Sequence, residues 1–223
     1  MKSIPLIVVT LGVVVVASVS GPASADPPPQ DRQLSAAIEL GARVGYSLPY
    51  GDAVSGNSMS SDINGRLPLE LDAGLRLSGR NLFLGAYLAY APVFLTSNVP
   101  SGISANTVDF GIQANYHMSP TGSIDPWFGL GVGWETYNMS GSANIVGYNI
   151  NFSGNDNGFS FRAELGIDFL LLDNNLGIGP FVSGTLAQYT NCGSSGGGDC
   201  SISGQTLHGW FTFGARGFYD IGI

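Results

Sequence analysis

Alternation with a period of two governs the last stretch of this chain, 207–223. All its charged and imidazole side chains (His208, Arg216 and Asp220) fall on even positions. The odd positions carry no charge and hold most of the large apolar side chains of the stretch. Since successive side chains of a strand point to opposite faces, the pattern predicts a strand with one apolar and one mostly polar face.

Seven earlier segments repeat this pattern, each bounded by Gly, Asn, Asp, Ser or Pro. Their ranges are about 34–47, 66–77, 82–95, 107–118, 126–137, 158–171 and 176–189. Thirteen charged residues fall within the eight segments, and all lie on the less apolar parity of their own strand: Glu39, Arg43, Arg66, Glu70, Asp72, Arg76, Asp109, Glu135, Arg162, Glu164, Asp168, Arg216 and Asp220.

The connections between segments alternate between long and short. The short ones include SGRN (78–81) and LDNN (172–175), which have the residue types of tight hairpins. One continuous apolar face, a polar face of mixed charge and alternating connections predict an all-β fold, an eight-stranded antiparallel up-and-down transmembrane β-barrel over 34–223. Aromatics near the strand ends fit the girdles of such barrels: Tyr46, Tyr90, Phe94, Trp134, Phe159 and Phe211 toward the long loops, and Tyr116, Phe128, Phe169 and Tyr219 toward the short turns.

The N-terminus has the layout of a secretory signal peptide. Lys2 precedes an apolar run, and an A-x-A site ends at Ala25. We expect cleavage near Ala25, with 26–33 as a periplasmic linker; the alternative is an uncleaved anchor. The remaining chain has seven arginines against 16 acids, a net charge of −9, which argues against nucleic-acid binding.

The two cysteines, Cys192 and Cys200, flank a flexible glycine-rich stretch. An oxidising compartment would favour a disulfide that pins this loop. The alternative is a metal pair, but no histidine or further cysteine lies near it in sequence.

Together the signal peptide, the eight alternating strands, the long loops and the closing strand resemble the small outer-membrane β-barrel family, which includes the OmpA transmembrane domain and OmpX. The resemblance implies the outer membrane of a Gram-negative-type cell, with outer-membrane lipid, lipopolysaccharide and the barrel-assembly machinery as partners. It implies an assembly signal at Tyr219, Ile221 and Ile223. Family members typically end in an aromatic residue, whereas this chain ends in Ile223.

In a barrel of eight strands the inward charges are expected to pair across a filled lumen. Acids exceed arginines there by eight to five, so a narrow cation-preferring path is the alternative to a plug. The expected network comprises Glu39, Arg43, Glu70, Asp72, Arg76, Asp109, Glu135, Arg162, Glu164, Asp168, Arg216 and Asp220.

Nothing in the sequence specifies an enzyme. His117 and His208 are expected at opposite ends of the barrel, too far apart to share a metal, although a Ser/His/Asp group near His208 stays open. We expect no cofactor, no metal and no catalytic residue. Gly129, Gly131 and Gly133 are expected to make room for inward side chains such as Trp210, Phe181 or Tyr189.

The predicted function is therefore a structural or surface-interaction role in the outer membrane, without naming an extracellular partner. One alternative is a porin-like channel for ions or small solutes. Another is a secreted, soluble, lipocalin-like barrel that binds an apolar ligand. The lipocalin alternative requires apolar residues inside and charges outside.

Overall fold

The computed structural model describes residues 36–54, 56–77, 79–145, 148–194, 200–202 and 204–223. The predicted signal peptide (1–25) and linker (26–33) lie outside these ranges and stay predictions.

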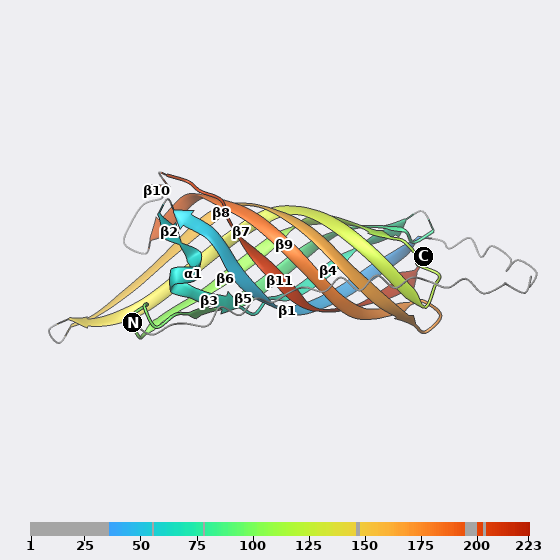
Figure 1. Ribbon diagram of the computed structural model, residues 1–223, viewed down its shortest axis with the longest axis horizontal. Coiled ribbons are helices and arrows are strands. Elements are labelled where there is room, and N and C mark those ends of the chain that lie inside the picture. Colours follow the sequence, from blue (N-terminus) through green and yellow to red (C-terminus); the bar gives the residue numbers. More distant parts are fainter. Residues whose placement is uncertain (1–35, 55, 78, 146–147, 195–199, 203) are drawn as a thin grey trace, which may run out of the picture. The chain divides into compact units, whose positions relative to one another are not determined.

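Long antiparallel strands run obliquely around a common axis (Figure 1). The strands that form the wall are β1 (Ala37–Val54), β3 (Ile63–Arg66) with β4 (Leu69–Leu77), β5 (Leu82–Leu95), β6 (Ile103–His117), β7 (Ile124–Ile145), β8 (Tyr148–Leu171), β9 (Leu176–Ser194) and β11 (His208–Gly222). Two short strands, β2 (Asn57–Ser58) and β10 (Cys200–Ser201), and one helical turn, α1 (Met59–Asp62), lie outside this set.

The wall closes on itself because the first strand pairs with the last. β1 pairs with β4 on one side and with β11 on the other, from Ala37 opposite Gly222 to Gly51 opposite His208. Every intervening neighbour in the sequence pairs in antiparallel fashion. The predicted eight-stranded up-and-down barrel is confirmed, with β3 and β4 together forming the second strand.

Pro68 explains why that second strand is split. A proline has no N–H to donate to a ladder, so regular pairing is interrupted between Arg66 and Leu69. Pairing still holds the break on both sides: the Gly45 N–H donates to the Pro68 carbonyl at 3.2 Å, and the Leu67 N–H donates to the Pro92 carbonyl at 3.1 Å.

The two predicted tight turns join their strands as expected. β4 ends at Leu77 and β5 begins at Leu82, while β8 ends at Leu171 and β9 begins at Leu176. Both turns use the left-handed backbone region, with φ of 71° at Gly79 and 56° at Asp173. These turns lie at the same end of the barrel as Ala37 and Gly222, where the wall begins and ends. We call this end the turn end and the opposite end the loop end.

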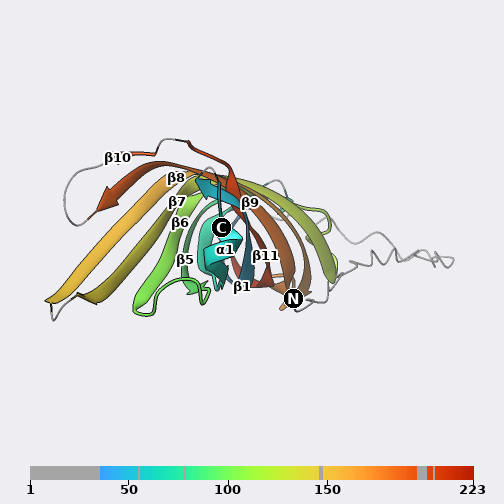
Figure 2. The same ribbon diagram turned by 60° about the vertical axis from the view of Figure 1, so that its left-hand side comes forward.

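At the loop end the wall is longer than the sequence pattern indicated. Residues 138–157 were expected to be a loop, but 138–145 continue β7 and 148–157 continue β8, and the two are paired as far as Ile145 opposite Tyr148. β6 and β9 also extend, so that a sheet of four strands projects past the ends of β1 and β5 (Figures 1 and 2). The inference failed because polar residues and glycines occur at both parities of this stretch, so no alternation marks it as strand.

The two faces of the wall have opposite chemistry. All thirteen predicted inward charges are buried. Large apolar side chains on the alternate parity are exposed, for example Leu71 at 66%, Ile112 at 64% and Leu165 at 60%. Within the described residues, no helix is long and apolar enough to cross a membrane.

Glycines on the inner face admit large side chains, but not the ones expected. A Cβ at Gly133 would overlap the Tyr87 hydroxyl, and one at Gly129 would overlap the Asn115 side chain. Gly166 similarly lies against the Trp127 indole. The expectation that Trp210, Phe181 or Tyr189 fills the space beside 129–133 was wrong, because the pairing register brings Tyr87 and Asn115 there instead.

Adding one methyl group at Gly166 should therefore destabilise the barrel. Gly166→Ala overlaps an indole that is 1% exposed, and overpacking of this kind costs about 1–3 kcal/mol. Gly184→Ala is the matched control, because a Cβ there meets nothing within 4 Å. The free energy of unfolding in urea, followed by tryptophan fluorescence in micelles, gives the comparison. Equal stability of the two variants would contradict the packing described.

Candidate functional site

The lumen gathers most of the charge in the described chain. Each of the six described arginines is buried, with 1% to 9% of its surface exposed. They come from β1, β3, β4, the 78–81 turn, β8 and β11. In each case the inward side chain lies at the same depth in the barrel as an acidic side chain from another strand, so the two form an ion pair. Their contacts form three layers along the barrel axis.

The layer at the turn end contains Glu39, Arg76, Arg216 and Asp220. Glu39 accepts a hydrogen bond from the Arg76 Nε and pairs with the Arg216 Nη2 at 3.4 Å. Asp220 lies 3.6 Å from the Arg76 Nε and 3.7 Å from Arg80 Nη1. Arg80 belongs to the tight turn, where its φ is 72°, and its Nη1 also donates to the Asn175 Oδ1 at 3.1 Å.

His117, Asp125 and Asp168 complete this layer. Asp168 lies 3.4 Å from the Arg216 Nε and 4.0 Å from the His117 Nδ1. The Arg76 Nη2 lies 3.3 Å from the His117 Nε2, and the His117 Nδ1 lies 2.8 Å from the Asp125 Oδ2. A guanidinium can only donate hydrogen bonds, so the His117 Nε2 accepts from Arg76. The His117 Nδ1 then carries the ring proton and donates a hydrogen bond to Asp125. Asp125 also accepts from the Ser119 N–H at 2.8 Å, which ties the connection between β6 and β7 to the lumen.

The middle layer joins two arginines to three carboxylates. The Arg43 Nε lies 3.1 Å from Asp72 and 3.4 Å from Glu70, and its Nη1 pairs with Glu164. The Arg162 Nη1 lies 2.8 Å from Glu70 and 3.3 Å from Glu164. Glu70 and Glu164 are shared by both arginines, so the layer is one connected network across the lumen.

The layer at the loop end is organised around Glu135. This carboxylate accepts from the Tyr189 hydroxyl at 2.6 Å and the Trp210 Nε1 at 2.9 Å. The His208 Nε2 lies 3.1 Å and the Arg66 Nη1 3.2 Å from it. Four partners from β3, β9 and β11 thus meet one fully buried acid on β7. Arg66 also contacts Asp109 at 3.0 Å and the Thr107 hydroxyl at 2.6 Å.

Aromatic rings fill the space between the layers. Five of the arginines lie over the face of a ring, an arrangement in which the ring quadrupole attracts the cation. The guanidinium carbon lies 4.1 Å from the Trp210 ring for Arg66, 4.4 Å from Phe218 for Arg76, 4.0 Å from Tyr87 for Arg162, 4.3 Å from Trp127 for Arg216 and 5.6 Å from Trp127 for Arg43.

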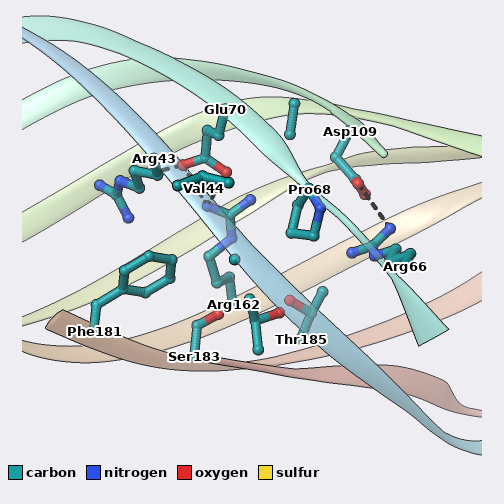
Figure 3. A pocket seen from close by; sticks show the side chains of 13 residues that line it. Arg43, Val44, Arg66, Pro68, Glu70, Asp109, Arg162, Phe181, Ser183 and Thr185 are labelled. Carbon is teal, nitrogen blue, oxygen red and sulfur yellow. Dashed lines mark hydrogen bonds and ion pairs between the residues drawn. The ribbon is translucent and has the colours of Figure 1, made fainter. Parts of the chain in front are cut away.

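The space left between the middle and loop-end layers is small. Figure 3 shows Arg43, Glu70 and Arg162 on one side of it, and Arg66 with Asp109 on the other. Its volume is ≈ 20 Å³, enough for about one water molecule.

The structure brings the expected lumen residues together, but sequence reasoning missed several members. Arg80 and Asp125 were assigned to connections, and the two histidines were given no partners. The two histidines lie at opposite ends of the barrel, as expected. His117 pairs opposite Trp127 near the turn end, and His208 pairs opposite Gly51 near the loop end. The sequence did contain a signal for the pair of His117 and Asp125. Both lie on the inward parity of neighbouring strands, close to the short connection that joins β6 to β7.

The remaining candidates are placed as follows. Tyr219, Ile221 and Ile223 all project from the outer face, 48%, 45% and 64% exposed. Cys192 lies opposite Cys200 in the β9–β10 register; the disulfide itself stays a prediction. Within the described chain, no serine hydroxyl hydrogen-bonds to His208, and no cluster of three or more His, Cys, Asp or Glu could hold a metal.

Known proteins resemble this chain in fold but not in sequence. No family model matches it, and no curated protein matches it. A major outer membrane protein from Thermus thermophilus has a TM-score of 0.50 and 11% identity, covering 83% of this chain and 99% of its own. The fold is that of a small outer-membrane β-barrel.

Two further solved structures are similar at lower scores. Neisserial surface protein A has 12% identity and a TM-score of 0.48 over 84% of this chain and 97% of its own. OprG from Pseudomonas aeruginosa has 14% identity and a TM-score of 0.44 over 86% of this chain and 100% of its own.

Removing the acid at the centre of the loop-end layer should destabilise the barrel strongly. Glu135→Ala leaves Arg66 with one carboxylate and strands three other buried donors. Breaking a buried ion pair on one side costs about 3–5 kcal/mol. The matched control is Asp173→Asn in an exposed turn, expected to change stability by less than about 0.5 kcal/mol. A loss below about 1 kcal/mol for Glu135→Ala in urea unfolding would contradict the assignment.

Proposed function

We propose that the protein is an integral outer-membrane barrel whose lumen is closed by its ion-pair network and whose projecting loop end serves surface contacts. The observation that carries the proposal is the inverted polarity of the wall. Charges point to the inside, and an apolar surface covers the outside between the two ends. Water cannot solvate such an exterior favourably, whereas the hydrocarbon core of a bilayer can.

Two aromatic girdles support the membrane placement. Trp134 lies opposite Phe159 toward the loop end, and Tyr116 lies opposite Phe128 toward the turn end with ring centroids 5.6 Å apart. Aromatic side chains favour the interface between hydrocarbon and water. The full strands β6, β7 and β8 are 15, 22 and 24 residues long, which is more than the roughly 9–11 tilted residues that cross a bilayer.

The same observations weigh against both alternative functions. A lipocalin-like barrel needs an apolar interior, but this interior holds three layers of ion pairs. A porin-like channel needs a continuous path, but the space at mid-barrel is ≈ 20 Å³. Outer-membrane lipid, lipopolysaccharide and the assembly machinery remain proposed partners, on the exposed outer face that includes Tyr219, Ile221 and Ile223.

A charge placed on the outer face distinguishes a membrane barrel from a soluble one. Leu71 is exposed at mid-barrel between the acids of the middle layer, and Leu71→Arg should cost about 2–4 kcal/mol in lipid vesicles. Leu207→Arg, at the loop end with 61% exposure, should cost about 0–1 kcal/mol. Equal, small effects at both positions would favour a soluble barrel. A mature protein that stays soluble without detergent after carbonate extraction would overturn the proposal independently.

Electrical recording tests whether the lumen is closed. In planar bilayers the purified barrel should show no steady conductance, because the middle layer leaves no room for a column of water. Protein-free micelles provide the baseline, and Asp156→Asn, outside the layers, is the control variant. A steady cation-selective current that Glu70→Gln or Glu164→Gln abolishes would replace the plug by a porin-like channel.

A further inference from the structure

A second hollow lies outside the ion-pair layers, in the mouth at the loop end. Its volume is ≈ 420 Å³, within the roughly 300–1,000 Å³ range of small-molecule sites. One wall is the inner face of the projecting sheet, which contributes Tyr137, Met139, Asp156 and Tyr189. The other wall is α1 with the connection that follows β5.

An apolar cluster forms the floor of this mouth cavity. Met59 and Ile63 from α1 and β3 pack with Val93, Ala105 and Trp210, all at most 9% exposed. Trp210 also caps Arg66 and donates to Glu135. The cavity therefore sits directly on the loop-end layer, separated from its charges by packed side chains.

Hydrogen bonds hold the α1 wall in place. The Thr96 N–H donates to the Asp62 carbonyl at 2.8 Å, and its hydroxyl donates to the Ser61 carbonyl at 2.9 Å. The Asn98 Nδ2 donates to the same Ser61 carbonyl at 3.0 Å. These bonds fix the end of α1 against the β5–β6 connection, and Figure 2 shows α1 inside the curve of the strands. A wall fixed in this way lowers the ordering cost of binding.

Two carboxylates line the cavity without a cationic partner. Asp156 faces Tyr137 across the β7–β8 register, and Asp62 lies at the end of α1. Neither forms an ion pair within the described chain, where all arginines are committed to lumen acids. The one basic group acting on Asp156 is His208, whose ring is already bonded to Glu135.

The raised pKa of Tyr137 also indicates an excess of negative charge around the cavity. Tyr137 and Asp156 lie beyond the Trp134–Phe159 girdle, outside the proposed membrane-spanning part. Burial, with the nearby charges of Asp156 and Asp62, raises the pKa of Tyr137 to about 12. Burial also raises the pKa of Asp156. A cation between these groups would stabilise the ionised carboxylates.

We propose that the mouth cavity is a binding site for an organic cation with an apolar body, such as an alkyl- or arylalkyl-ammonium. Asp62 and Asp156 supply the opposite charge. Tyr137 and Tyr189, with ring centroids 6.5 Å apart, offer π faces to the ammonium. Met59, Met139 and Leu95 contact the apolar body, and thioethers adapt readily to varied shapes. The site goes beyond the proposed structural role and does not depend on whether the lumen conducts.

A matched pair of probes tests the charge requirement. The wild-type barrel, in maltoside micelles with an uncharged headgroup, is titrated with 4-phenylbutyltrimethylammonium and with 4-phenylbutanol by calorimetry. Protein-free micelles give the partitioning baseline. We expect saturable binding of the ammonium at one site and at least about tenfold weaker binding of the alcohol.

Variants locate the site. Asp62→Asn with Asp156→Asn should weaken ammonium binding by about tenfold or more, and Tyr137→Leu by about tenfold. Asp52→Asn, at the same end but not lining the cavity, should bind as the wild type does. Heat-modifiable migration in detergent gels checks that each variant is folded, so a failure of the barrel itself is seen separately.

Three outcomes would overturn the proposal. Equal affinity for the alcohol would show an apolar hollow without cation preference. Absence of saturable ammonium binding to the folded wild type would show no site of this kind. Ammonium binding unchanged by the double substitution would place the site elsewhere.

Discussion

Pairing of charge with charge inside a narrow, water-poor lumen is the constraint on which the rest of this barrel depends. A single buried ion is costly, so each arginine must find acids at its own depth, and each acid must find donors. Glu135 shows how far this is carried, with four partners drawn from three strands. The aromatic rings between layers exclude water, which strengthens the remaining electrostatic contacts.

Much of the fold was predictable because lipid, water and the lumen each select a different side-chain chemistry. Parity alone located thirteen of the inward charges, from Glu39 to Asp220, and turn-type residues located 78–81 and 172–175. The projecting part of β7 and β8 was not predictable in this way. Polar residues and glycines occur at both parities there, so no alternation marks the stretch as strand.

Most members of the candidate site were predictable from the sequence, but the pairs that they form were not. Parity says which residues point inward, whereas the depth at which they meet depends on register and strand tilt. Arg80 shows the limit most clearly: it belongs to a turn, where no alternation marks it as inward, and yet its Nη1 lies 3.7 Å from Asp220. The mouth cavity was likewise invisible, since it combines α1, the β5–β6 connection and the far side of the sheet.

The seam between β1 and β11 sets like charges side by side, Glu39 opposite Asp220 and Arg43 opposite Arg216. A slip of four residues in either direction would match opposite charges on these two strands, placing Glu39 opposite Arg216 or Arg43 opposite Asp220. The ion pairs that stabilise the observed register therefore come mainly from other strands, chiefly from Arg76 on β4 and from the acids Asp72, Glu164 and Asp168. Closure of the ring in this register therefore depends on charges contributed by the intervening strands as well as by the two terminal ones.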